Sequence, residues 1–162
     1  MATIQAAPFD KVAAILQGYA DKAVFRGYNK GQLRNGRAVH KVLWHRDQVF
    51  ELVMDTRRKT MHFPVLLPRV PARSEMYKAF QGFLRSFTDP AVPEHRRIDP
   101  RKARVSCANR RGTVSLTMTV HGGEYEYAAR KIVQLVHEVF LLFLLPYFDW
   151  ECEVYDLDPD RP

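Results

Sequence analysis

The fold is decided by residues 103–145, which read ARVSCANRRGTVSLTMTVHGGEYEYAARKIVQLVHEVFLLFLL. Residues 103–108 and 113–120 read as two strands joined by a polar turn. In the second strand every even position is apolar and every odd position is Ser or Thr, which predicts one dry face and one wet face. A helix from Glu124 to about Leu145 follows, and its apolar residues form one stripe: Tyr125, Ala128, Ala129, Ile132, Val133, Val136, Phe140 and Phe143. We expect this stripe to pack on the dry face of the hairpin.

The preceding residues supply the other elements. Pro8 and Asp10 open a helix that Gly27 ends, and residues 28–37 form a basic, flexible loop. A second helix, 75–87, begins after Ser74, which is a suitable N-cap. Three strands are expected between the loop and this helix, at residues 39–44, 49–54 and 60–67. Pro64 cannot donate a ladder hydrogen bond, so the third of these strands is expected at a sheet edge or near its own end.

The C-terminal segment fits two patterns. Phe148, Trp150, Cys152 and Val154 alternate with acidic residues, as in a strand, whereas Tyr147, Trp150, Val154 and Leu157 have helical spacing. We expect a strand. The whole chain, 1–162, then reads as a single α+β domain with helices packed on an antiparallel sheet. The element order is α-β-β-β-α-β-β-α plus a short C-terminal element.

Composition and length agree with one globular domain. The 162 residues are 46% hydrophobic and 27% charged, which excludes a disordered chain. The longest apolar run, 139–145, is far shorter than the roughly 20 residues of a membrane span, and no secretory signal is visible. Two cysteines are too few for a disulfide scaffold and are expected as buried thiols. These features predict a cytoplasmic protein without membrane association.

The formal charge of +7 is unevenly distributed along the chain. Residues 1–112 carry 22 Lys and Arg against 9 Asp and Glu, a net of +13, and residues 113–162 carry 3 against 9, a net of −6. The two segments could attract each other within one chain or between copies. The alternative is a mixed, solvated surface.

The element order resembles that of the small dimeric chaperones of type III secretion and of the related bacterial YbjN-type proteins, over residues 8–145. The resemblance implies an antiparallel sheet with helices packed on it, frequent homodimers, and peptide or protein binding without catalysis. Those chaperones are usually acidic, whereas this chain is basic, and the C-terminal element has no counterpart in their minimal fold. The resemblance carries no functional residues.

Residues that could support catalysis do not form a recognised pattern. The six histidines lack metal-ligand spacing and no phosphate-binding glycine loop is present, so no metal and no cofactor are expected. Residues 121–124, HGGE, place a histidine and an acid where a strand passes into a helix, and could hold an anion or form only a tight turn. We favour the turn, and we expect Cys107 in the core. A small enzyme using the His121–Glu124 turn stays an alternative.

Two predicted hairpin tips are basic: one carries Arg57, Arg58 and Lys59, and the other carries Arg110 and Arg111. If both tips lie at the same end of the sheet, they form an anion patch for nucleic acid. The aromatic residues fit core stripes and leave no exposed platform for base stacking. Nucleic-acid binding is therefore the weaker alternative.

The end of the last helix is apolar on every side, whereas its earlier turns keep a polar face. Either Phe148 and Trp150 fold back over these side chains, or a second copy covers them. We favour a homodimer whose interface contains Leu141, Leu142, Leu144 and Leu145. The sequence thus predicts a non-enzymatic, homodimeric adaptor or chaperone-like module that binds a protein or peptide.

Overall fold

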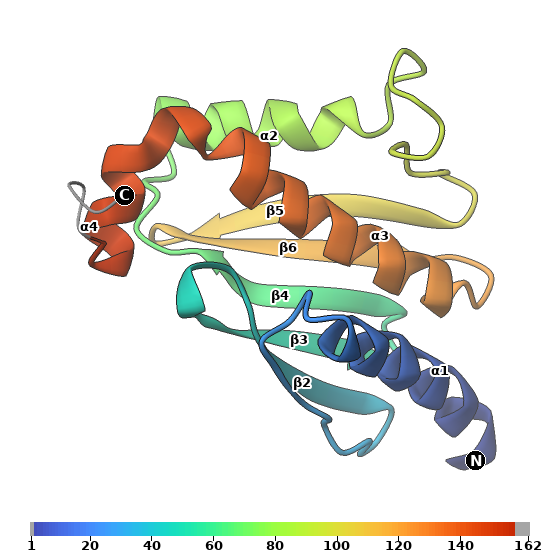
Figure 1. Ribbon diagram of the computed structural model, residues 1–162. Coiled ribbons are helices and arrows are strands. Elements are labelled where there is room, and N and C mark those ends of the chain that lie inside the picture. Colours follow the sequence, from blue (N-terminus) through green and yellow to red (C-terminus); the bar gives the residue numbers. More distant parts are fainter. Residues whose placement is uncertain (1, 158–162) are drawn as a thin grey trace.

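The computed structural model of the protein describes residues 2–157, with side chains from residue 7 onward. It contains a six-stranded antiparallel sheet and four α-helices (Figure 1). The helices are α1 (Ala2–Asp21), α2 (Glu75–Ser86), α3 (Tyr125–Glu138) and α4 (Phe148–Tyr155). The strands are β1 (Gly27–Asn29), β2 (Arg37–Leu43), β3 (Val49–Asp55), β4 (Thr60–Leu67), β5 (Ala103–Arg110) and β6 (Thr113–Val120). The predicted α+β class, with helices packed on an antiparallel sheet, is confirmed.

The strands follow the order β1-β2-β3-β4-β6-β5 across the sheet. Helices α1 and α3 lie side by side over one face of the sheet, and α2 runs along the outer strand β5 (Figure 1). Ser74 caps α2 as predicted, since its hydroxyl accepts a hydrogen bond from the Tyr77 N–H at 3.1 Å. The core lies between this helical layer and the sheet.

No helix of residues 2–157 covers the opposite face of the sheet, and we call it the open face (Figure 1). The alternation predicted for β6 is confirmed, because Val114, Leu116, Met118 and Val120 are buried whereas the Ser and Thr side chains between them are half-buried. Cross-strand pairs share a face, so the register identifies the open-face residues of the neighbouring strands. They include Arg37, Val39 and Lys41 of β2, Glu51, Val53 and Asp55 of β3, Thr60 and His62 of β4, and Arg104, Ser106 and Arg110 of β5.

Three expectations about the first half of the chain differ from the structure. The loop predicted at 28–37 contains β1, which pairs with β2 at the sheet edge, and α1 ends at Asp21 rather than at Gly27. Strand β4 lies between β3 and β6 and is not an edge strand. The sheet tolerates Pro64 there because the ladders on both sides of β4 are interrupted at this residue.

The C-terminal element is the helix α4 and not the expected strand. Acidic residues in its first turn favour a helix N-terminus, and Trp150 and Tyr155 pack against the core from one side of that helix. The expected long helix also ends earlier. A π-helical turn at Val139–Phe143 and a short 3-10 turn at Leu145–Tyr147 separate α3 from α4.

No single helix within residues 2–157 has the length and apolar composition needed to cross a bilayer. Two consecutive helical segments, Tyr125–Phe143 and Leu145–Tyr155, have the required length and apolar composition only when they are taken together, and they are bent by 59° relative to each other.

Candidate functional site

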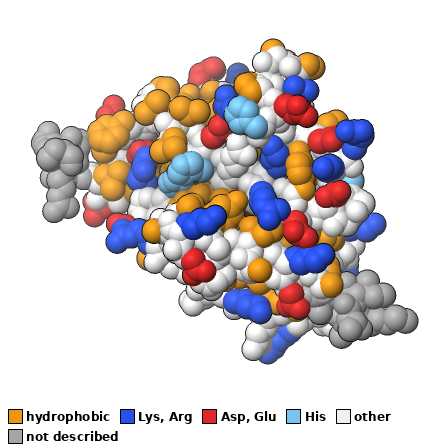
Figure 2. All heavy atoms as spheres, turned by 45° about the vertical axis from the view of Figure 1, so that its right-hand side comes forward, with side chains coloured by type: hydrophobic (Ala, Val, Ile, Leu, Met, Phe, Trp, Pro, Cys, Tyr) orange, Lys and Arg blue, Asp and Glu red, His pale blue; other side chains and the backbone are white. Residues whose placement is uncertain are grey.

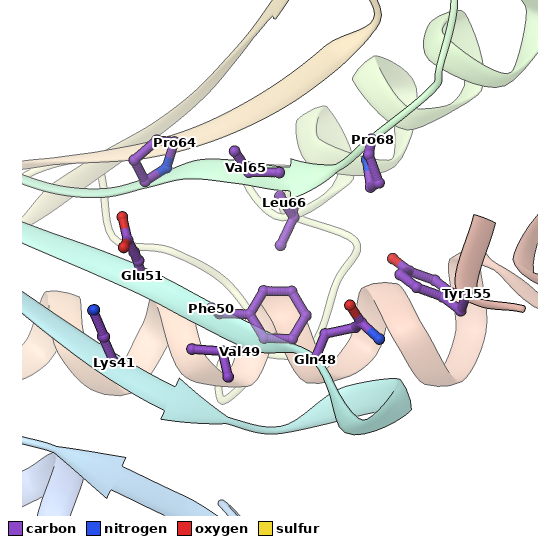
Figure 3. Close-up of a pocket in the computed structure, with 10 residues that line it drawn as sticks. All are labelled: Lys41, Gln48, Val49, Phe50, Glu51, Pro64, Val65, Leu66, Pro68 and Tyr155. Atoms are coloured by element: carbon purple, nitrogen blue, oxygen red, sulfur yellow. The ribbon is translucent and has the colours of Figure 1, made fainter.

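A cleft of about 410 Å³ lies where β3 and β4 move apart within the sheet (Figure 3). The two strands pair only through Val53–Asp55 and Thr60–His62. Beyond these pairs β3 continues along β2 alone, and β4 continues along β6. The sheet is therefore split at this end, and the cleft occupies the split.

Pro64 explains why the strands separate at this point. The register that pairs Val53 with His62 would place Glu51 opposite Pro64 as the next hydrogen-bonded pair. Pro64 has no N–H to donate to the Glu51 carbonyl, so the ladder ends. On its other side, β4 contains a bulge between Phe63 and Leu67, which bends the strand away from β3.

The split leaves backbone groups of β3 directed into the cleft. The Trp44 N–H donates to the Gln48 carbonyl, and the Thr56 N–H donates to the Gly36 carbonyl. With the β2–β3 register, these two bonds show that the even-numbered residues of β3 direct their N–H and C=O groups towards β2. In an antiparallel ladder, successive residues direct their backbone groups to opposite neighbours, so Val49 and Glu51 face away from β2. Their N–H and C=O groups meet no partner strand among the described residues. They form a short strand edge inside the sheet.

The walls and floor of the cleft are mainly apolar. Val49 on β3 is 62% exposed and Val65 on β4 is 54% exposed, and they border the cleft from opposite sides (Figure 3). Phe50 and Leu66 are buried beneath them. Lys41 and Glu51 add one charge of each sign. The lining contains no histidine, cysteine or serine; the remaining lining residues are Gln48, Pro64, Pro68 and Tyr155.

Helix α4 closes one end of the cleft with Tyr155. The Tyr155 hydroxyl is buried, has no hydrogen-bond partner among the described residues, and points towards the cleft (Figure 3). Burial raises the pKa of this phenol, and the nearby Glu151 carboxylate raises it further. Tyr155 therefore stays protonated at neutral pH and keeps an unused hydrogen-bond donor beneath this end of the cleft.

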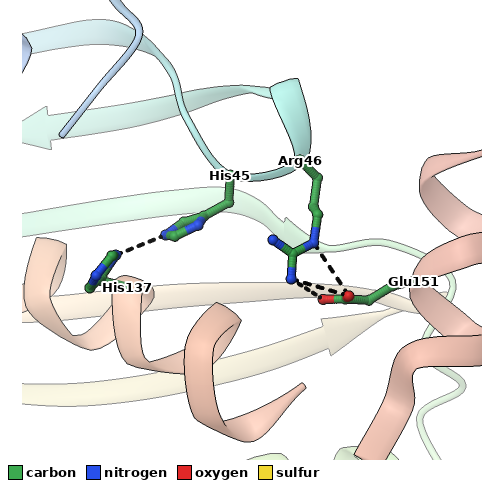
Figure 4. Close-up of polar contacts among 4 residues, drawn as sticks. All are labelled: His45, Arg46, His137 and Glu151. Atoms are coloured by element: carbon green, nitrogen blue, oxygen red, sulfur yellow. Dashed lines mark hydrogen bonds and ion pairs between the residues drawn. The ribbon is translucent and has the colours of Figure 1, made fainter. Parts of the chain in front are cut away.

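Contacts with both sides of the split hold α4 in place. Arg46, in the turn between β2 and β3, donates to both carboxylate oxygens of the buried Glu151, at 3.0 and 3.2 Å (Figure 4). The Trp150 indole N–H donates to the carbonyl of Arg69, just after β4, at 3.1 Å. The helix thus ties the β3 side of the cleft to the β4 side.

Two histidines meet beside this ion pair. His45 Nε2 and His137 Nδ1 lie 3.3 Å apart (Figure 4). Burial, with smaller contributions from the neighbouring His137 and Arg46, lowers the pKa of His45 to about 4. No group of three His, Cys, Asp or Glu side chains within the described part of the chain is placed to hold a metal ion.

The two basic tips lie at opposite ends of the sheet, so they do not form the shared patch on which the nucleic-acid prediction depended. Lys59 accepts a hydrogen bond from the N–H of Val120, at the end of β6. The tip with Arg110 and Arg111 precedes the start of β6, and Gly112 accepts from the N–H of Val70. Arg57 and Arg58 instead lie near Arg34 and Arg37, around a separate hollow.

The predicted leucine interface is exposed except for one residue. Leu141, Leu142 and Leu145 are 48–69% exposed, and Phe148 beside them is also exposed. Leu144 is buried, because the π-helical turn rotates it towards the core. Figure 2 shows hydrophobic side chains gathered at one end of the molecule. Phe148 and Trp150 do not cover the leucines, so the intramolecular alternative is not adopted.

The remaining sequence candidates lie in a tight turn and against the core. Gly122 and Gly123 both have positive φ, and the N–H of Glu124 donates to the His121 carbonyl, which makes residues 121–124 a tight turn. A hollow beside it is lined by Glu124 but not by His121. Cys107 packs against the core near Tyr77, and burial raises the pKa of its thiol.

Sequence reasoning missed the cleft itself. Pro64 in an otherwise regular strand pattern was the available signal, and it was interpreted as marking a sheet edge or the end of its strand. Tyr155 and Glu151 could not be assigned because the segment that carries them was expected as a strand.

Comparison of the chain with protein-family models, with curated proteins and with solved structures gave no match.

Proposed function

We propose that the protein is a non-enzymatic, homodimeric binding module that takes an extended segment of a partner protein into the cleft between β3 and β4. The observation that carries this proposal is the strand edge at Val49 and Glu51, which opens onto an apolar cleft. An added strand would supply the missing ladder partner on that side.

The cleft suits binding better than catalysis. An extended peptide could pair with Glu51 through its backbone while alternate side chains pack against Val49 and Val65. The Tyr155 hydroxyl could donate to a peptide carbonyl at the closed end. The lining offers no nucleophile beside a general base, which an acyl-transfer or hydrolytic site would need.

The proposal can be tested with peptides selected from a display library against the full chain. We expect selected peptides to slow hydrogen exchange at the Val49 and Glu51 amides, since these become hydrogen-bonded. A peptide can be N-methylated at its odd-numbered or at its even-numbered residues. Only one of these two sets should abolish binding, because only every second residue directs its N–H to β3.

A matched pair of variants locates the binding. Val65→Lys places a charge in the cleft, and we expect at least a tenfold loss of peptide affinity. Val24→Lys makes the same change at an exposed valine outside the cleft lining and should leave affinity unchanged. Equal affinity for both variants would show that the cleft is not the binding site.

A further inference from the structure

Four arginines without acidic partners surround a hollow of about 620 Å³ on the open face, away from the cleft. Arg34 comes from the turn before β2, Arg37 is the first residue of β2, and Arg57 and Arg58 come from the turn between β3 and β4. None of the four forms an ion pair with another described residue, whereas other cations of the chain do so in seven places.

The single acid in the hollow is already engaged by the backbone. Asp55 Oδ1 accepts hydrogen bonds from the N–H groups of Arg57 and Arg58, both at 3.0 Å. Its charge shapes the turn and leaves the guanidinium groups available. Four arginines against one carboxylate give the hollow a net charge of +3.

The two turns that carry the arginines are fixed to each other. The N–H and hydroxyl of Thr56 both donate to the carbonyl of Gly36, at 2.7 and 3.0 Å. Asn35 and Gly36 both have positive φ, a combination that an Asn-Gly turn adopts readily. A side chain at Gly31 would collide with the backbone of Val39, so the preceding loop packs closely on β2. The arginines therefore project from an ordered base.

The hollow continues into a polar row across the sheet. Arg37 pairs with Asp55, Asp55 with Thr60, Thr60 with Thr119, and Thr119 with Arg104. The next row on the same face adds His62, Thr117 and Ser106. With strands about 4.8 Å apart, four steps from β2 to β5 span about 19 Å. Basic groups lie at both ends of this row; between them lie hydroxyl groups and the Asp55 carboxylate, which the backbone of its own turn already engages.

We propose that this row binds the sugar-phosphate backbone of a single nucleic-acid strand, running from the arginine hollow across β3, β4 and β6 to Arg104. Guanidinium groups match phosphate oxygens with two parallel hydrogen bonds, and Ser and Thr hydroxyls donate to phosphate and sugar. The row lies flat in the sheet and has no projecting helix or ribbon to enter a major groove, which favours a single strand over a duplex. It also lacks aromatic side chains, so binding is independent of base sequence and sensitive to salt.

Fluorescence anisotropy with a labelled 20-nucleotide oligouridylate, between 50 and 200 mM NaCl, tests the proposal. Arg57 and Arg58 are exposed, and their side chains form no hydrogen bond with any described residue, so R57S/R58S should fold normally. We expect at least a tenfold loss of affinity at 50 mM salt. The slope of log affinity against log salt should fall by about 1.4, which corresponds to two lost phosphate contacts on a single strand.

R110S/R111S is the matched control, because it removes the same charge from the hairpin tip at the other end of the sheet. We expect it to change affinity less than twofold, and Arg104→Ser to lower affinity two- to fivefold. Equal losses in the two double variants, or no loss with Arg104→Ser, would overturn the proposed path. A duplex bound more tightly than the oligouridylate, or equal competition by a 20-residue polyglutamate, would overturn the assignment to a single strand. Val65→Lys should leave oligonucleotide binding unchanged, so this proposal and the peptide cleft can fail independently.

Discussion

His40 lies on the core side of β2, fully buried and stacked on Phe9. Its Nδ1 accepts hydrogen bonds from the Gly31 N–H at 3.2 Å and from the Tyr28 hydroxyl, 3.0 Å away. Nε2 is buried and has no partner among the described residues. Burial, and to a smaller extent the nearby Lys30, together lower the pKa of His40 from 6.5 to about 4. This imidazole is therefore neutral in the folded protein at ordinary pH.

The depressed pKa predicts a loss of stability in acid. Between pH 6.5 and about 4 the unfolded chain takes up a proton at His40 that the folded chain refuses, so the free energy of unfolding falls as the pH falls. The loss from this one residue is on the order of 3 kcal/mol. Urea unfolding at pH 7, 5.5 and 4 measures it.

His40→Gln should reduce that pH dependence, because a glutamine oxygen can still accept from Gly31 and Tyr28 but does not titrate. His95→Gln, at an exposed loop position, is the control and should leave the dependence unchanged. The same slope in both variants would remove His40 from the explanation. The remaining slope should come from His45 and His62, whose pKa values burial also lowers.

The sequence contained one signal for the role of His40. It stands between Ala38 and Val42 in an alternating strand, and this places it on the inward face. What sequence could not show is that Gly31 and Tyr28 approach one ring nitrogen and nothing approaches the other. That asymmetry depends on how the loop before β2 folds back.

At the scale of elements, α4 depends on the ion pair between Arg46 and Glu151. The Glu151 side chain is only 4% exposed, so removing its partner leaves a carboxylate in the core. We expect Arg46→Met to lower the free energy of unfolding by about 3 kcal/mol, as for other broken buried pairs. Chemical denaturation of the variant measures the loss.

Arg26→Met provides a control from the same turn region. Arg26 pairs with Asp47, and both side chains are largely exposed, so this variant should cost less than about 1 kcal/mol. Equal losses of unfolding free energy in the two variants would show that Arg46 contributes little to the stability of the buried Glu151 carboxylate. Limited proteolysis should also cleave near α4 faster in Arg46→Met than in Arg26→Met.

Local pattern predicted the elements that bury one face over many residues. The β5–β6 hairpin, α2 and α3 each repeat apolar residues often enough for one period to dominate. Helix α4 has eight residues that satisfy both periods, and its docking through Arg46 decided between them. Strand β1 has only three residues and gains its structure from pairing with β2, so it left no pattern of its own.

Pro64 shows the same limit at the candidate site. Its chemistry was interpreted correctly, because the β3–β4 ladder ends where Pro64 would have to donate. Its consequence for the sheet was not interpreted correctly, because a ladder can also be interrupted inside a sheet when a bulge bends one strand away from its neighbour. The position of Pro64 opposite Glu51 follows from register, which one sequence does not specify.

At the scale of the molecule, α1, α2 and α3 pack on one side of the sheet and leave the open face to two separate features (Figure 1). The cleft lies at one end of β3 and the arginine hollow at the other. The exposed leucines form a third surface, at the junction of α3 and α4. The net charges of +13 and −6 on the two parts of the chain attract each other, and the ion pairs Arg46–Glu151 and Arg96–Glu138 join the two parts within one chain.

We predict that the chain forms a homodimer through Leu141, Leu142, Leu145 and Phe148. An isologous pairing needs only one self-complementary patch, and exposed apolar side chains on neighbouring turns supply one. Light scattering should give a mass near twice the 18.8 kDa of one chain at tens of micromolar protein. Leu141→Glu should give a folded monomer, because Leu141 is already half exposed in the single chain and can carry a charge there. Val65→Glu makes a similar change in the cleft and should stay dimeric. A dimer broken by Val65→Glu and kept by Leu141→Glu would mean that the copies pair through the strand edge, and a wild-type mass of 18.8 kDa would exclude the dimer at that concentration.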